Sequence, residues 1–133
     1  MANEFWLNLP VKNINRSKEF FTALGFKFNN GPGSTSVSAP LLIGKKDVMV
    51  MLFEEATFKG FVNRDITDTK TACEVLLSFD ASSKEEVDEM AKKAVAAGGE
   101  TTHIPSEMKG PMYGCVFSDP DGHQWNVLYL ARQ

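Results

Sequence analysis

The two halves of this 133-residue chain carry the same order of segments. A strand-like run at residues 6–11 leads into a helical segment that ends at Gly25. About half the chain later, a second strand-like run at residues 74–79 leads into a helical segment that ends at Gly99. Further strand-like stretches close each half. A period that splits a small chain in two predicts a duplicated supersecondary unit, and two such units can close around one cavity.

Composition limits the classes of partner. The net charge is −3, and the basic side chains form only isolated pairs at 45–46 and 92–93. Nucleic acids and anionic membranes are bound through basic patches, so neither is expected as a partner. No run of apolar residues reaches transmembrane length, and the N-terminus lacks the pattern of a signal peptide. The two cysteines, Cys73 and Cys115, lack metal-type spacing and predict reduced thiols in a cytoplasmic protein.

Local signals set the expected bounds of the elements. Asn13 or Asn15 can cap the first helix, and Ser82 with Glu85 resembles a capping box for the second. The segment at 55–71 is irregular and is expected to be a connector between the halves. The Pro-Ser-Glu run at 105–107 is expected to be a loop. The remaining strands are expected over residues 26–28, 36–43, 47–53, 100–103, 111–117 and 123–130.

Two motifs at opposite ends of the chain resemble one family. Residues 11–26 look like the opening of the vicinal oxygen chelate superfamily, which includes glyoxalase I, extradiol dioxygenases, fosfomycin-modifying enzymes and bleomycin-binding proteins. Residues 119–123, followed by an aromatic and aliphatic strand, look like its closing motif. Residues 8–13, 61–65 and 112–114 resemble a bacterial subgroup that is loosely described as lactoylglutathione-lyase-like.

This resemblance implies an α+β fold. The fold has two β-α-β-β-β modules, here at residues 5–54 and 72–131, whose curled mixed sheets surround a central cavity. It also implies a homodimer, which the aromatic residues of the connector support because they could bury surface between subunits. The modules of such a fold pair either within one chain or between two chains, and the sequence leaves both arrangements open.

Metal-dependent members of the superfamily hold a divalent ion with His, Gln or Glu from the first and last strands of each module. The resemblance places these ligands at Trp6, Met51 or a neighbour, Glu74 and Asn126. Trp lacks a suitable lone pair, and Met suits copper(I) rather than harder ions. One carboxylate and one amide are too few for a catalytic metal. We therefore expect no metal and no other cofactor.

Alternation along the strands selects the side chains that face the cavity. It places Trp6, Asn8, Glu74 and Asn126 on that side. Glu74 is the best candidate for a base or for the anchor of a cationic ligand. A frayed strand start, an ion pair with Lys or Arg, or a side chain that faces solvent would explain it equally well. His103 and His123 are expected to be surface or hydrogen-bonding residues. The candidate ligand-binding residues are Trp6, Asn8, Glu74, Tyr113, Gln124 and Asn126.

Three functions remain open. The first is a metal-free protein that binds a small molecule, as bleomycin-binding relatives do. The second is a divalent-metal-dependent lyase or isomerase of glyoxalase type, or a relative of the dioxygenases, with an atypical ligand set. The third is a non-catalytic interaction protein that keeps the fold for dimerisation. The number of usable metal ligands favours the first, and the sequence does not name the ligand.

Overall fold

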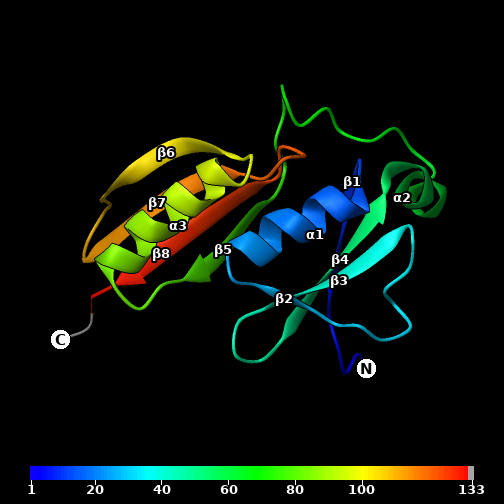
Figure 1. Cartoon of the computed structure of the whole chain (residues 1–133), viewed down its shortest axis with the longest axis horizontal. Helices are drawn as coiled ribbons and strands as arrows, with labels where there is room; N and C mark the ends of the chain where they lie inside the picture. The colour runs from blue at the N-terminus through cyan, green and yellow to red at the C-terminus, as the bar shows by residue number, and fades with distance from the viewer. Residues whose placement is uncertain (132–133) are drawn as a thin grey trace. The chain divides into compact units, whose positions relative to one another are not determined.

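The computed structural model describes residues 1–131 (Figure 1). The chain divides into two compact units, Met1–Thr67 and Asp68–Gln133. We call them unit 1 and unit 2, and each contains one four-stranded sheet.

Unit 1 has the strand order β1-β4-β3-β2, in which β1 and β4 are parallel and the other neighbours are antiparallel. Helix α1 packs on the sheet, and the short helix α2 follows the last strand. The elements are β1 (Leu7–Val11), α1 (Ile14–Ala23), β2 (Lys27–Phe28), β3 (Ser38–Ile43), β4 (Val48–Glu54) and α2 (Glu55–Val62).

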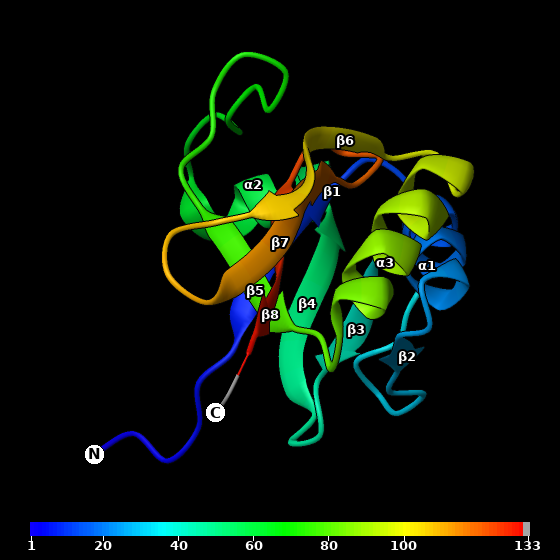
Figure 2. The same cartoon turned by 90° about the vertical axis from the view of Figure 1, so that its left-hand side faces the viewer.

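Unit 2 repeats this plan with the strand order β5-β8-β7-β6 and the same parallel first pair. Helix α3 lies along one face of the sheet (Figure 2). The elements are β5 (Leu76–Asp80), α3 (Lys84–Ala96), β6 (Glu100–Glu107), β7 (Met112–Ser118) and β8 (Gln124–Leu130). The predicted α+β fold with two β-α-β-β-β modules is confirmed.

Side-chain caps fix the starts of both long helices. The Asn13 side chain accepts a hydrogen bond from the Arg16 backbone N–H and so caps α1. In α3 the cap is Ser83, which accepts from the Glu86 backbone N–H at 3.1 Å, so the expectation that Ser82 is the cap is wrong by one residue. The Glu86 carboxylate accepts from the Ser82 backbone N–H, one residue before the cap, and so supplies a variant of the reciprocal bond of a capping box.

Several boundaries differ from the sequence-based expectations. The first part of the connector is a helix, α2, which ends where Asn63 adopts a left-handed conformation. Strand β6 continues through Pro105 to Glu107, where we expected a loop, and it can do so because β6 is an edge strand with a bulge. Strand β5 begins at Leu76, two residues later than expected.

Large apolar side chains form the core of each unit on the face that its helix covers. In unit 1 these include Phe20 and Phe21 of α1, and Phe20 meets Phe21 edge to face with ring centroids 5.0 Å apart. In unit 2 they include Trp125 and Phe117, both almost fully buried. Burial of each such side chain contributes about 1.5–3 kcal/mol, so this face of each sheet is fixed by packing. The opposite face is free to carry function.

Within the described chain, no helix combines the length and the apolar character that a membrane span requires.

Candidate functional site

The face of the unit 2 sheet opposite α3 carries a row of side chains that contains no carboxylate, ammonium or guanidinium group. We call it the open face of unit 2. Backbone pairing places Ser78 of β5 beside Asn126 of β8, Asn126 beside Val116 of β7, and Val116 beside His103 of β6. Paired residues of neighbouring strands project from the same face of a sheet. The four side chains therefore form one row across all four strands.

Two irregularities in β6 add polar groups to this face. The pairing register shifts between Thr101 and His103, and again between His103 and Ser106. Such bulges set extra residues of one strand against its partner and change the direction of side chains. The Thr102 hydroxyl donates to the Gln124 side-chain oxygen at 2.9 Å, which places Thr102 beside β8 residues of the open face. The Ser106 hydroxyl lies 3.4 Å from the His103 Nε2.

Hydrogen bonds orient the amide side chains on β8. The Asn126 Nδ2 donates to the Ser78 hydroxyl at 3.1 Å, and the Gln124 Nε2 donates to the Gly122 carbonyl at 3.2 Å. Among residues 1–131, no partner is found for the Asn126 side-chain oxygen. That oxygen is therefore available as an acceptor on the open face.

Gln124 and Asn126 lie on the side of β8 that strand alternation predicts. They alternate with Trp125 and Val127, whose exposed fractions are 2% and 0%. Because the buried pair packs under α3, the amide pair must project from the opposite face. Gln124 and Asn126 thus lie on the open face because Trp125 and Val127 are packed in the core.

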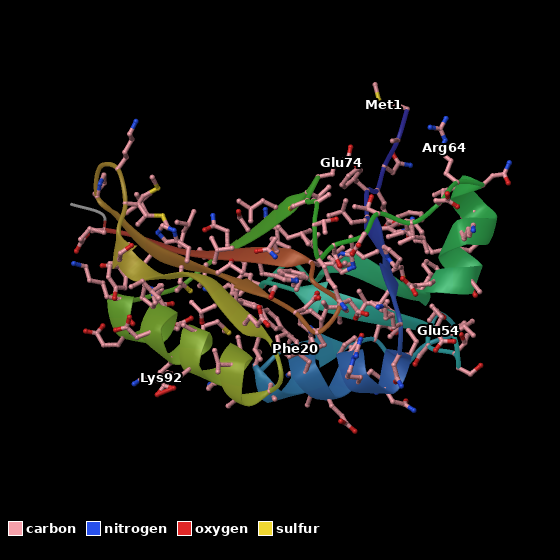
Figure 3. The ribbon with its side chains drawn as sticks, turned by 90° about the horizontal axis from the view of Figure 1, so that it is seen from above. Met1, Phe20, Glu54, Arg64, Glu74 and Lys92 are labelled. Carbon is pink, nitrogen blue, oxygen red and sulfur yellow. The ribbon has the colours of Figure 1, made fainter. Side chains whose placement is uncertain are left out.

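Glu74 lies away from this row. It is exposed and precedes the first residue of β5 (Figure 3). In the strand pairing, the neighbour of Asn126 is Ser78, which is four residues further along the chain. Four residues of extended chain span about 13 Å. The structure therefore does not bring the Glu74 carboxylate next to the Asn126 amide.

Tyr113 points to the other side of the sheet. Its hydroxyl donates to the Asp88 carboxylate of α3 at 2.6 Å, and this hydrogen bond raises the pKa of Tyr113 to about 12. The Lys84 Nζ lies 5.4 Å from the centre of the Tyr113 ring and forms a 2.6 Å ion pair with Glu107. The tyrosine hydroxyl that we expected in the pocket thus joins β7 to α3 instead.

Unit 1 places two of the predicted positions on the face opposite α1. Asn8 of β1 pairs with Met51 of β4, and Met51 pairs with Pro40 of β3. Asn8 is exposed, and Trp6, which comes just before β1, retains 51% of its surface. These side chains are accessible within unit 1, as a ligand site would require.

The loop between β2 and β3 covers the Met51 position. A Cβ atom added to Gly33 would lie 3.2 Å from Pro40 Cγ and 3.7 Å from Met51 Cε, so the loop backbone passes directly over these two side chains. The Ser38 hydroxyl donates to the Gly33 carbonyl at 2.7 Å and holds the loop in place. The chain itself thus occupies the space over the thioether.

The donors present do not fit the divalent ion that the family resemblance implies. Trp6 and Met51 are unsuitable by chemistry, and the loop also covers Met51. Asn126 offers one amide oxygen, and Glu74 lies outside the paired strand, so these two residues supply at most one weak and one ordinary ligand. In residues 1–131, no group of three or more His, Cys, Asp or Glu side chains is arranged to hold a metal.

The acidic turn of the closing motif is structural. The buried Asp119 carboxylate accepts hydrogen bonds from the Trp125 indole N–H at 3.0 Å and from the backbone N–H groups of Asp121 and His123. Burial raises the pKa of Asp119, while the nearby His123 and the bond from Trp125 act in the opposite direction. This carboxylate fixes the turn that leads into β8 and thereby positions Gln124 and Asn126.

Sequence reasoning missed the contributions of Thr102, His103 and Ser106. Regular alternation fails in β6 because the bulges change the side-chain direction. Pro105, inside the same segment, was the available signal, since a proline within a strand indicates an edge or a bulge.

Comparison with known proteins agrees with this fold. The model of the Glyoxalase/Bleomycin resistance protein/Dioxygenase superfamily matches residues 5–127. A hypothetical protein from S. aureus is 33% identical, with a TM-score of 0.87, over 96% of this chain and 94% of that one. No curated protein matches the chain.

More distant solved structures share the fold. A glyoxalase/bleomycin resistance protein/dioxygenase family enzyme from Burkholderia phytofirmans has a TM-score of 0.80 at 18% identity, over 95% of this chain and 97% of that one. A genomically encoded fosfomycin resistance protein from Listeria monocytogenes has a TM-score of 0.69 at 19% identity, over 100% of this chain and 94% of that one. The match to the family model and the similarity to the S. aureus protein lead to one conclusion: this chain belongs to the Glyoxalase/Bleomycin resistance protein/Dioxygenase superfamily.

Proposed function

We propose that this chain binds a small organic molecule without a catalytic metal. The observation that carries the proposal is the set of residues at the four positions where metal-dependent members of the family hold their ion. The family resemblance places these positions at Trp6, Met51 or a neighbour, Glu74 and Asn126. Of these side chains only the Glu74 carboxylate is an ordinary ligand for a hard divalent ion, and Glu74 lies outside the strand. A reaction that needs a divalent ion at these four positions would lack the side chains that bind the ion.

The open face of unit 2 supports binding. It combines hydrogen-bonding groups on β5, β6 and β8 with the apolar side chains of Val116 and Leu128. Binding sites for small molecules are typically apolar with a few placed polar groups.

The proposal places the chain in the lactoylglutathione-lyase-like subgroup, as a cytoplasmic protein without a nucleic acid or membrane partner. This subgroup is suggested by motifs such as the one at residues 8–13.

Metal analysis tests the proposal. The purified chain should contain far less than one equivalent of zinc, nickel or manganese, and titration with each ion should give no saturable heat. A matched variant, Asn126→Glu, restores the carboxylate that the family has on its closing strand and should bind these ions more tightly than the wild type.

One outcome would favour the alternative, a metal-dependent lyase or isomerase with an atypical ligand set. It is one tightly held ion per wild-type chain that is lost in Glu74→Gln. Since that substitution keeps the size of the side chain, loss of the ion would identify the carboxylate as a ligand and overturn the metal-free proposal.

A further inference from the structure

The loop between β2 and β3 contains the only Asn-Gly dipeptide of the chain, Asn30–Gly31. Asn30 is exposed, and its side chain forms no hydrogen bond within the part of the chain that the structure describes. Strand β2 ends at Phe28 and β3 begins at Ser38, so no regular element restrains the dipeptide. Exposed loop segments open locally at little cost in free energy. The Asn30 side chain is therefore able to turn back on its own backbone.

An asparagine followed by glycine can form a cyclic imide. The Gly31 nitrogen loses its proton to hydroxide and attacks the Asn30 Cγ, which closes a five-membered ring. The bond between Cγ and Nδ2 breaks, and Nδ2 takes a proton from water and leaves as ammonia. Glycine has no Cβ atom, so no side chain shields the attacking nitrogen. Water then opens the ring at Cγ, which gives aspartate, or at the backbone carbonyl carbon, which gives isoaspartate.

One contact opposes this reaction. The Gly31 backbone N–H donates to the Asn29 side-chain oxygen at 2.7 Å, and this hydrogen bond must break before the nitrogen attacks. Asn29 is itself exposed, so water replaces the bond readily. The net free energy of one such bond slows the reaction by about 2–12-fold. A factor of this size delays ring closure without preventing it.

A second dipeptide that could form the same ring, Asp121–Gly122, is locked in its turn. The Gly122 backbone N–H donates to the Asp119 carbonyl at 2.9 Å, and the Asp121 backbone N–H donates to the Asp119 carboxylate at 2.9 Å. The Thr69 side chain also packs against Gly122. The attacking nitrogen of this turn is thus held by the folded structure, whereas that of Gly31 is held by one exposed side chain.

We propose that Asn30 is a site of spontaneous deamidation. The reaction replaces a neutral amide with a carboxylate and makes the net charge one unit more negative than −3. It needs only water and hydroxide, so no enzyme or cofactor takes part. The proposal concerns the loop of unit 1 and is independent of the ligand-binding role proposed for unit 2.

The isoaspartate product also changes the loop that covers Met51. The Asn29 backbone N–H donates to the Pro40 carbonyl at 2.9 Å, and the Gly33 carbonyl accepts from the Ser38 hydroxyl at 2.7 Å. Isoaspartate adds one carbon atom to the main chain between these two anchors. The backbone that passes over Met51 then has to shift, because both ends of the longer segment stay fixed.

Mass spectrometry tests the proposal on the full chain. The folded protein is incubated in mildly alkaline water that is labelled with heavy oxygen, and is then digested with trypsin. The peptide 28–45 contains Asn29 and Asn30 as its only asparagines. It should gain the mass of a labelled acid in place of an amide, located at residue 30 by fragmentation. Aspartate and isoaspartate forms should separate by chromatography, and conversion during digestion lacks the label.

Variants and an internal control test the assignment. Asn30→Gln should stay unmodified, because the longer side chain would have to close a six-membered ring. Asn29→Ala removes the acceptor of the Gly31 N–H and should speed the reaction by about 2–12-fold. Asn63 is the control within the same digest, since it is exposed but is followed by Arg64. It should keep its amide throughout.

The effect on the loop has its own measurement. The NMR signal of the Met51 methyl group should move in the aged wild type and should not move in aged Asn30→Gln. An unchanged signal in a sample that contains isoaspartate would show that the loop does not respond.

Two results would overturn the deamidation site itself. One is an intact amide at residue 30 after an incubation that converts the free peptide 28–45, which would show that the fold protects Asn30. The other is conversion of Asn63 as fast as that of Asn30, which would remove the distinction that the Asn-Gly dipeptide makes. Neither result bears on metal content or on small-molecule binding.

Discussion

At the scale of single residues, Tyr113 shows how packing redirects a side chain that looks functional. Its hydroxyl lies 2.6 Å from the Asp88 carboxylate, on the face that α3 covers. Tyr113 alternates in phase with Cys115 and Phe117, both buried. The apolar residues of the strand thus contained the information that this tyrosine faces the helix. The sequence could not predict that Asp88 lies next to the Tyr113 hydroxyl, because this contact depends on how α3 packs on the sheet.

The hydrogen bond between Tyr113 and Asp88 predicts an alkaline titration. The pKa of Tyr113 rises from the ordinary value of 10.0 to about 12 because the bond to Asp88 favours the neutral phenol. Its stabilising contribution is therefore complete below the ordinary value and is lost as the pH rises through about 12. The difference in phenolate absorbance between wild type and Tyr113→Phe should show a transition near the raised value.

The control for this titration is Asp88→Asn, which keeps the size of the side chain and removes the charge. It should move the Tyr113 transition back towards the ordinary pKa of a tyrosine. A wild-type transition already at the ordinary value would show that the bond to Asp88 does not form in solution.

At the scale of elements, the sequence predicts the helices and strands whose buried residues recur at regular spacing. Helix α3 follows this rule, since Val87, Ala91 and Ala94 are buried at helical spacing. Helix α2 has no buried residue and is only eight residues long, and its segment was interpreted as an irregular connector. The bulged strand β6 was expected to end before Pro105 because a Pro-Ser-Glu run is typical of a loop, whereas the edge strand accommodates the proline.

The turn before β8 illustrates a contact that the sequence could not provide. The Thr69 hydroxyl donates to the Asp121 carbonyl, and this docks the 68–72 turn on the Asp-Pro-Asp-Gly turn. Gly122 has a φ of +87°, and a Cβ atom there would lie 2.8 Å from Thr69 Cβ. The glycine is thus required both by its conformation and by this close approach.

Substitution of this glycine should destabilise unit 2. We expect Gly122→Ala to lower the free energy of unfolding by about 1–3 kcal/mol, because it combines a strained backbone with a clash. The matched control is Gly60→Ala within α2, where a Cβ meets nothing within 4 Å. It should instead stabilise by about 0.5–1 kcal/mol through helix propensity. Urea denaturation measures both, and equal effects would contradict the role of Thr69.

At the scale of the whole molecule, two units of the same topology have different faces opposite their helices. In unit 1 the loop at Gly33 covers Met51, and Phe61 of α2 packs edge to face on Phe53 with ring centroids 5.0 Å apart. In unit 2 the corresponding face carries the row of Ser78, Asn126, Val116 and His103. Duplication explains the shared strand order, whereas the divergent side chains assign the ligand-binding role that we propose chiefly to unit 2.

The exposed apolar surface of α2 supports the prediction that the protein is a homodimer. Phe61 and Val62 retain 63% and 42% of their surface, and adjacent exposed apolar side chains are typical of interaction surfaces. Sedimentation velocity at micromolar concentration should show a dimer, and Val62→Lys should shift it towards monomer because an unpaired charge is costly to bury. The matched control is Val95→Lys on α3, where Val95 is similarly exposed, and it should remain dimeric. A monomeric wild type would exclude the dimer, and dissociation by Val95→Lys alone would move the interface to α3.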